Sequence, residues 1–230
     1  MNKTLLVDLQ TREYKETWEL QRRLVELRAR ALIPDILLLV EHPHVITMGT
    51  SAKAENILSK RFPVYEVERG GDVTYHGYGQ LVGYPIIDLT QRDKDIRRFV
   101  RSLEVTLIET LDHFGISAQR IEGRTGVWIV EQQLRKKIAS IGVAVRGWVT
   151  FHGFALNVST DLTCFSAINP CGYDSGVMTS VSEQLRKQVP VAAVKDPLTK
   201  AFEHVFATEL ETVSEEKLTR LPENDTSVRT

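Results

Sequence analysis

One cysteine of this sequence stands where its thiol could act as a nucleophile. Cys171, in the segment NPCGY, lies between a proline and a glycine, a pattern typical of a turn that presents a side chain to a cleft. A cysteine attacks as its thiolate, and a thiol of ordinary pKa, ~8.5, is mostly protonated at neutral pH. A cationic or basic group is therefore expected beside Cys171, from a distant segment because no histidine is near in sequence. The other cysteine, Cys164 in LTCF, fits a buried apolar residue.

Three residues could supply that basic group. Lys137, in KKIASIGV, stands at the head of an apolar strand, where burial would favour base chemistry. His76 in TYHG and His152 in FHGFALNV compete with it, although a histidine within a strand is more often a hydrogen-bonded structural residue. Spacing alone does not choose among the three.

A glycine-rich segment, RGGDVTYHGYGQ, is a candidate binding loop. It runs from Arg69 to Gln80, and four of its twelve residues are glycine, with Arg69 and His76 among them. Glycines let bare backbone approach a ligand closely. The phosphate-binding pattern GxxxxGK[ST] is absent, and the segment does not lead from a strand into a helix as GxGxxG does. The sequence therefore predicts a ligand loop and leaves its ligand open.

The composition is that of an ordinary soluble globular domain. The 230 residues are enough for one large core, and the net charge of -1 argues against electrostatic binding of nucleic acid. No apolar run is long enough to span a bilayer, and the first residues lack the apolar length of a signal peptide, so we expect a cytoplasmic protein. Neither the two cysteines nor the carboxylates show a metal-site spacing, so no metal is expected.

The hydrophobic pattern mixes helices and strands without regular alternation. We predict three helices and eight strands: helices at Tyr14–Ala31, Asp93–Phe114 and Asp196–Glu209, and strands at Ile36–Val40, Val45–Met48, Val64–Val67, Val73–Tyr75, Leu81–Ile87, Gly126–Val130, Lys137–Val145 and Val149–Val158. Asp93 is the expected N-cap of the second helix, Gly115 its stop, and Leu134–Lys136 and Arg146–Trp148 are expected turns. These elements predict an α+β fold with a mixed, largely antiparallel sheet flanked by helices. The expected domain covers residues 1–215, followed by a polar tail at 216–230.

Six segments in order give the chain a strong resemblance to the lipoyl(octanoyl) transferase family. They are RGGDVTYHGYGQLVGYPIIDL, EGRTGVWI, KIASIGVAV, FHGFALNVSTDL, INPCG and TSVSEQL, and the match covers about residues 1–210. The family implies a fold like the catalytic domain of biotin and lipoate protein ligases. One departure is visible, because Tyr78 stands where the family usually has proline in HGPGQ.

The resemblance also implies roles for individual residues. Cys171 resembles the acyl-accepting nucleophile, and Lys137 the lysine that lowers the thiol's pKa and handles protons, which selects it over the two histidines. The walls of the acyl site are expected from three segments: Arg69, Gly70, Gly71, Asp72, Val73, Thr74, Tyr75 and His76; Ser140, Ile141 and Gly142; and Gly153, Phe154 and Ala155.

The implied reaction moves an octanoyl group from octanoyl-acyl carrier protein to a lysine of a lipoyl domain, through an octanoyl-cysteine thioester. It is the first step of protein lipoylation, and it needs no cofactor or ATP because the thioester stores the acylation energy. Lipoyl domains of 2-oxoacid dehydrogenase complexes and the glycine cleavage H protein are the implied acceptors. An acidic carrier would favour basic docking residues such as Arg22, Arg23, Arg97 or Arg98.

Three rival functions fit parts of the same pattern. An ATP-dependent lipoate or biotin ligase on this fold would activate a free acid and need no cysteine. A non-catalytic acyl or nucleotide sensor would use the glycine-rich loop only for binding. An amidotransferase would pass octanoyl between carrier domains through the same cysteine.

Overall fold

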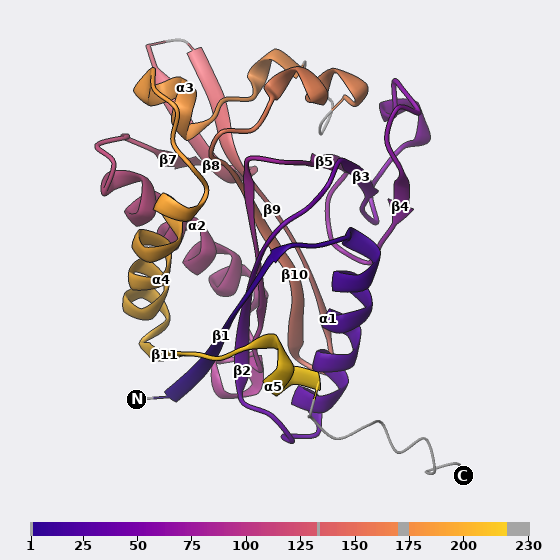
Figure 1. Cartoon of the computed structure of the whole chain (residues 1–230), viewed down its shortest axis with the longest axis vertical. Coiled ribbons are helices and arrows are strands. Elements are labelled where there is room, and N and C mark those ends of the chain that lie inside the picture. Colours follow the sequence, from indigo (N-terminus) through magenta and orange to yellow (C-terminus); the bar gives the residue numbers. More distant parts are fainter. Residues whose placement is uncertain (1, 133, 170–174, 220–230) are drawn as a thin grey trace.

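A computed structural model describes residues 2–132, 134–169 and 175–219 (Figure 1). Its strands are β1 (Asn2–Thr11), β2 (Asp35–Glu41), β3 (Val45–Met48), β4 (Val64–Glu66), β5 (Val73–His76), β6 (Gln80–Ile86), β7 (Gln119–Ile121), β8 (Arg124–Glu131), β9 (Leu134–Arg146), β10 (Val149–Asn157) and β11 (Thr208–Thr212). Its α-helices are α1 (Tyr14–Ala29), α2 (Ile96–Asp112), α3 (Val181–Leu185), α4 (Ala192–Phe206) and α5 (Glu215–Thr219).

The strands form two sheets. Eight of them lie in the order β11-β1-β2-β6-β10-β9-β8-β7, and a smaller sheet has the order β4-β3-β5. In the large sheet β1 pairs in parallel with β11 and with β2, and all the remaining neighbouring pairs are antiparallel. The predicted α+β fold with a mixed, largely antiparallel sheet is confirmed.

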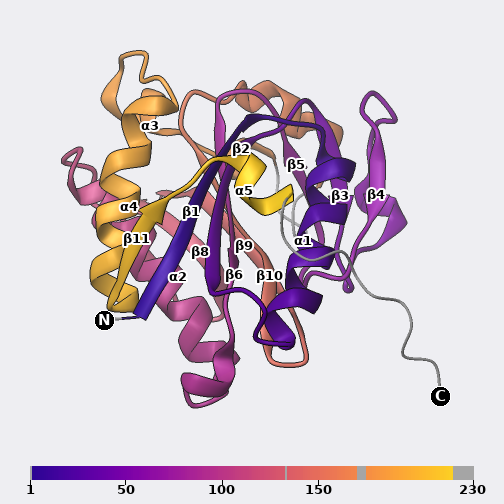
Figure 2. The same ribbon diagram turned by 60° about the horizontal axis from the view of Figure 1, so that its bottom comes forward.

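Helices cover both faces of the large sheet (Figures 1 and 2). Because side chains alternate along a strand, β2 sends Ile36 and Leu38 toward α1, and Leu37 and Leu39 toward α2 and α4. All four side chains are buried. This double coverage explains why ILLLV is a continuous apolar run, and it leaves the central strands β6, β10 and β9 rigidly held between two cores.

Some boundaries differ from the sequence prediction. The strands β1 and β11 at one side of the sheet were not predicted. The expected turn at Leu134–Lys136 is the start of β9, which pairs with β8. The N-cap of α2 is Asp95, whose side chain accepts from the Arg98 amide, while Asp93 has a left-handed φ of 60°. The domain boundary at residue 215 stays a prediction, and Leu218 of α5 is buried in the core on the α1 side.

A nearly buried ion cluster ties the end of α1 to the large sheet. The Arg28 Nε donates to Asp35 Oδ1 at 2.8 Å, and its Nη1 lies 3.4 Å from Asp88 Oδ2. The three side chains are only 11%, 10% and 15% exposed. Removing the shared cation would leave two desolvated carboxylates side by side.

We therefore expect Arg28→Met to lower the free energy of unfolding by about 3 kcal/mol or more, measured by urea denaturation at pH 7. The matched control is Arg98→Met, because the Arg98–Asp93 pair is 70% and 76% exposed and should contribute less than about 1 kcal/mol. Equal losses in the two variants would contradict the assignment.

Candidate active site

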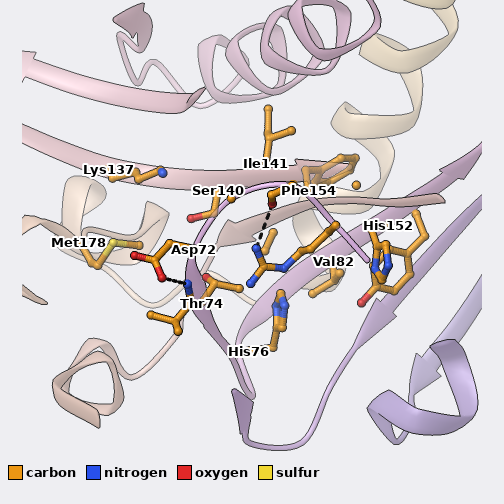
Figure 3. Close-up of a pocket in the computed structure, with 18 of the residues that line it drawn as sticks. Asp72, Thr74, His76, Val82, Lys137, Ser140, Ile141, His152, Phe154 and Met178 are labelled. Carbon is orange, nitrogen blue, oxygen red and sulfur yellow. Dashed lines mark hydrogen bonds between the residues drawn. The ribbon is translucent and has the colours of Figure 1, made fainter. Parts of the chain in front are cut away.

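A narrow cavity of about 60 Å³ lies on the α1 face of the large sheet, against the glycine-rich segment (Figure 3). The floor comes from β6, β10 and β9, where Ala155 is in register with Val82 on one side and with Ser140 on the other. In Figure 3, Lys137 and Met178 lie at one end of the group of lining residues and His152 at the other. The cavity is therefore elongated between a cationic end and an end lined by a buried imidazole.

The structure brings nearly all of the predicted wall residues to this cavity. Its lining comprises Tyr14, Arg69, Gly70, Gly71, Asp72, Val73, Thr74, His76, Val82, Tyr84, Lys137, Ser140, Ile141, Gly142, His152, Gly153, Phe154, Ala155, Val177 and Met178. Tyr75 is the predicted wall residue that does not line it. Its ring packs on Phe165, and its hydroxyl bonds His44 Nδ1 at 2.7 Å. Tyr75 is fully buried in a separate apolar cluster with Ile46 and Phe165.

Several lining residues were missed from the sequence. Val82 and Tyr84 alternate along β6 and face the same side as Ala155, so the period of two could have found them. Tyr14, at the start of α1, stacks on His76 with ring centres 5.9 Å apart. Met178 directly precedes the motif segment TSVSEQL, but its own residue type gave no reason to place it at the cavity.

The glycine-rich segment is held against β9 by backbone contacts. The Gly70 amide donates to the Val143 carbonyl at 2.9 Å. A Cβ at Gly142 would stand 2.9 Å from the Gly70 carbonyl oxygen and 3.0 Å from Arg69 Cδ, so this close approach requires glycine. Arg69 is itself 8% exposed, and its guanidinium donates to Thr47 and to the Gly70 carbonyl. The wall is thus a fixed surface.

Tyr78 occupies the position where the resembled family usually has proline. Its side chain is 50% exposed, and its ring meets that of His44 edge-on, with centres 5.2 Å apart. The bulky residue therefore packs on the outside of the segment, and it is not among the residues that line the cavity.

Lys137 is placed at the cavity with its ammonium against an aromatic ring. The residue is 8% exposed, and its Nζ lies 5.3 Å from the centre of the buried Trp128 ring. A Cβ at Gly126 would stand 2.7 Å from Lys137 Cε, so glycine there leaves space for the lysine side chain. The Gly126 amide in turn donates to the buried carboxylate of Glu104 at 3.0 Å. Trp128 and Gly126 thus fix the path of the Lys137 side chain.

The predicted nucleophile, Cys171, lies outside the described residues. After that gap the chain resumes with a 3-10 turn at Ser175–Val177, and Met178 forms a parallel bridge with Lys137. The Thr179 amide also donates to the Lys137 carbonyl at 3.0 Å. The described segment that follows Cys171 therefore runs beside Lys137.

Both candidate histidines are buried at the cavity. Burial lowers the pKa of His76 to about 3, with the neighbouring His42 adding to the effect, and its Nδ1 donates to Gln80 Oε1 at 2.7 Å. Burial lowers the pKa of His152 to about 4, although Glu68, 3.5 Å from its Nε2, opposes this. Both imidazoles are therefore neutral at neutral pH.

Burial also lowers the pKa of His42 to about 4. The lowered pKa values of His42, His76 and His152 predict that the fold is less stable in acid. In the unfolded chain a histidine has a pKa of ~6.5, and in the fold these three have lower values. Each histidine therefore contributes its full stabilisation above about pH 6.5, and that stabilisation is lost as the pH falls toward the folded-state pKa. Three such groups give a slope of up to about 4 kcal/mol per pH unit. We expect urea denaturation to show markedly lower stability at pH 5 than at pH 7. Imidazole signals of all three that titrate between pH 6 and 7 by NMR would contradict this.

The described residues contain no group of three or more histidine, cysteine, aspartate or glutamate side chains placed to hold a metal ion. No helix within the described ranges is long and apolar enough to cross a membrane.

Comparisons with known proteins agree with this geometry. The model of the lipoyl protein ligase A/B catalytic domain matches residues 13–203. The chain is 42% identical over 231 residues to an octanoyltransferase of Christiangramia forsetii, covering 91% of this chain and 99% of that protein. It is 46% identical over 191 residues to an octanoyltransferase of Geobacter metallireducens, covering 83% and 88%.

Solved structures show the same fold at low identity. A bi-partite lipoate protein ligase from Thermoplasma acidophilum superimposes with a TM-score of 0.69 at 20% identity, covering 96% of this chain and 91% of that one. A biotin protein ligase from Aquifex aeolicus gives a TM-score of 0.52 at 14% identity, covering 90% and 70%.

Proposed function

The chain belongs to the lipoyl protein ligase A/B catalytic domain family and, within it, to the octanoyltransferases, and we propose that it works through an octanoyl-Cys171 thioester. It is an acyltransferase that transfers an octanoyl group in protein lipoylation. The proposed donor is octanoyl-acyl carrier protein. The proposed acceptors are lysines of the lipoyl domains of 2-oxoacid dehydrogenase complexes and of the glycine cleavage H protein, and the proposed location is the cytoplasm.

The observation that supports this mechanism best is the character of the cavity. A buried lysine stands at one end, and the wall beside it consists of glycine backbone and of side chains such as Ile141, Phe154 and Ala155. Such a wall suits a thin apolar acyl chain, and the cation suits a thiolate and a proton transfer at the carbonyl end.

In the first half-reaction the Cys171 thiolate attacks the thioester carbonyl carbon of the donor. The bond from that carbon to the phosphopantetheine sulfur breaks, and the released thiolate takes a proton from the Lys137 ammonium. Octanoyl-Cys171, a free carrier thiol and a neutral Lys137 result. A cation beside the thiol also favours its ionised form before attack.

In the second half-reaction the neutral amine of the acceptor lysine attacks the octanoyl-Cys171 carbonyl. The carbon–sulfur bond breaks, the amine loses a proton to Lys137, and the octanoyl amide is released. The Cys171 thiolate and the Lys137 ammonium are thereby restored. The neutral histidines at the cavity are not needed for either transfer.

The test is a mass measurement. Incubation with octanoyl-acyl carrier protein should add one octanoyl group to the protein, labile to hydroxylamine, and a lipoyl domain added afterwards should take it up. Cys171→Ala should acquire no adduct, whereas Cys164→Ala, which removes a buried thiol, should acquire it normally. Persistence of the adduct in Cys171→Ala would sink the nucleophile assignment.

The same assay separates the rivals. Octanoylation of a lipoyl domain from octanoate and ATP, without carrier protein, would mean a ligase reaction. Transfer only from an octanoylated H protein or lipoyl domain would mean an amidotransferase, and binding without turnover would mean a sensor.

A further inference from the structure

The cavity with Lys137 continues into a groove that leads away from it along the surface. A hollow of about 450 Å³ shares Gly70, Gly71, Lys137, Ile141 and Gly142 with the cavity. That hollow shares its outer residues Val100, Gly123, Arg124 and Thr125 with a third hollow of about 870 Å³. The three hollows form one path from the cavity to the N-terminal half of α2 and the β7–β8 turn.

The outer end of the path is rich in arginine. Arg97 and Arg101 come from α2, Arg120 from β7 and Arg124 from β8. The first three are exposed, and among residues 2–132, 134–169 and 175–219 none of them has a carboxylate within ion-pair distance. The chain as a whole has a net charge of -1, so these four arginines make a local concentration of positive charge.

Two carboxylates also line the outer hollow. Glu104 is buried, it accepts from the Gly126 amide at 3.0 Å, and burial raises its pKa. Glu122 is exposed at the turn after β7. The balance of the outer hollow is therefore positive, which favours an anionic partner.

A single aromatic side chain joins the two ends of the path. The Trp128 ring has Lys137 Nζ at 5.3 Å from its centre and the Arg124 guanidinium carbon at 5.9 Å. The groove between them is bordered by Gly70, Gly71, Gly123 and Gly142, which present backbone instead of side chains. The groove thus presents bare peptide groups along its course and arginines at its outer end.

We propose that Arg97, Arg101, Arg120 and Arg124 dock the acyl carrier donor, with its phosphopantetheine arm lying in the groove toward Lys137. The inference rests on the proposed function. The arm is long and thin, has two amides that can bond bare backbone, and bears a phosphodiester at its far end, which arginine binds well. The acidic face of the carrier meets the exposed arginines. An acceptor lysine side chain is short and carries no anion, so the distant arginines fit the donor better than the acceptor.

The test compares donors of decreasing size on the full-length protein. In the triple variant Arg97→Glu, Arg101→Glu, Arg120→Glu, kcat/KM for octanoyl-acyl carrier protein should fall at least about tenfold, through KM, and more steeply at low salt. With octanoyl-pantetheine, which lacks both phosphate and protein, kcat/KM should equal that of the wild type. Octanoyl-phosphopantetheine separates recognition of the phosphate from recognition of the protein. The control is the triple variant Lys15→Glu, Lys200→Glu, Lys217→Glu, which reverses the same number of charges at exposed lysines that line none of the three hollows.

Three results would overturn the proposal. They are an unchanged KM for the carrier donor, an equal loss with octanoyl-pantetheine, or a rise of KM for the lipoyl domain instead. Direct binding of holo-acyl carrier protein to the wild type and to the triple variant does not depend on turnover. If the wild type binds the carrier and the variant does not, the docking proposal is supported even if no octanoyl transfer is observed. The docking surface and the proposed function can therefore be rejected independently. Thermal unfolding of the triple variant checks that it is folded.

Discussion

Replacing Lys137 with methionine is expected to slow octanoyl transfer by about 10³-fold at saturating substrates. Methionine keeps the length and the packing on Trp128 but removes both the positive charge beside the thiol and the proton carrier, and proton transfer by a positioned group contributes ~10²–10⁴-fold. The loss should appear in both half-reactions. Single-turnover formation of octanoyl-Cys171 and its discharge to a lipoyl domain measure them separately.

Two further variants sharpen this result. Lys137→Arg keeps the cation but cannot accept a proton, so it should preserve acylation better than discharge. Arg135→Met is the matched control, because Arg135 is exposed on β9 and the change removes an equal charge two residues away. The rate of thiol alkylation is measured against pH in proteins that also carry Cys164→Ala. Its pH profile should shift to higher pH when Lys137→Met is added. An unchanged alkylation profile would mean that Lys137 does not tune the thiol.

Enlarging Val82 to phenylalanine is expected to shorten the acyl chain that the enzyme accepts. Val82 is 1% exposed, lines the cavity and lies away from Lys137 in Figure 3. A ring there would exclude about four methylenes, each worth ~0.8 kcal/mol of burial, so kcat/KM for octanoyl donor should fall about 200-fold. Butanoyl donor should react as it does with the wild type.

The neighbouring Leu81→Phe controls for overpacking. Leu81 is fully buried but faces α2 and α4 on the opposite side of the sheet. Leu81→Phe should lower the free energy of unfolding without changing the ratio of kcat/KM for octanoyl donor to kcat/KM for butanoyl donor. An unchanged ratio in Val82→Phe would place the acyl chain elsewhere.

The predictable parts of the fold are those with strong hydrophobic periodicity. The strands β2, β3, β6 and β10 were predicted within a residue or so of their ends, because buried apolar runs are unambiguous. The strand β11, TELET, is mostly exposed and polar, and it is a strand because β1 lies beside it. Such an edge strand has no signature of its own in the sequence.

The site follows the same division. Motif segments predicted the walls from Arg69 to His76 and on β9 and β10, except that Tyr75 is buried in a separate apolar cluster. The position of His152 depends on a left-handed φ of 55°, rare for a residue other than glycine, with its amide donating to Gln21 Oε1. A residue 131 positions away supports that geometry, so no local pattern could have predicted it.

The pairing of β1 with β11 has a consequence for how the chain folds during synthesis. One side of β1 can pair with β2 early, since β2 follows within the first 41 residues. Its other side pairs with Thr208–Thr212, where Thr4 and Thr208 share a buried hydrogen bond across 204 positions. While the chain is being made, that side of β1 is an unpaired strand edge, open to association with other chains. The large sheet is therefore completed only when β11 has been synthesised. Until then the unpaired edge of β1 must be kept from pairing with other chains.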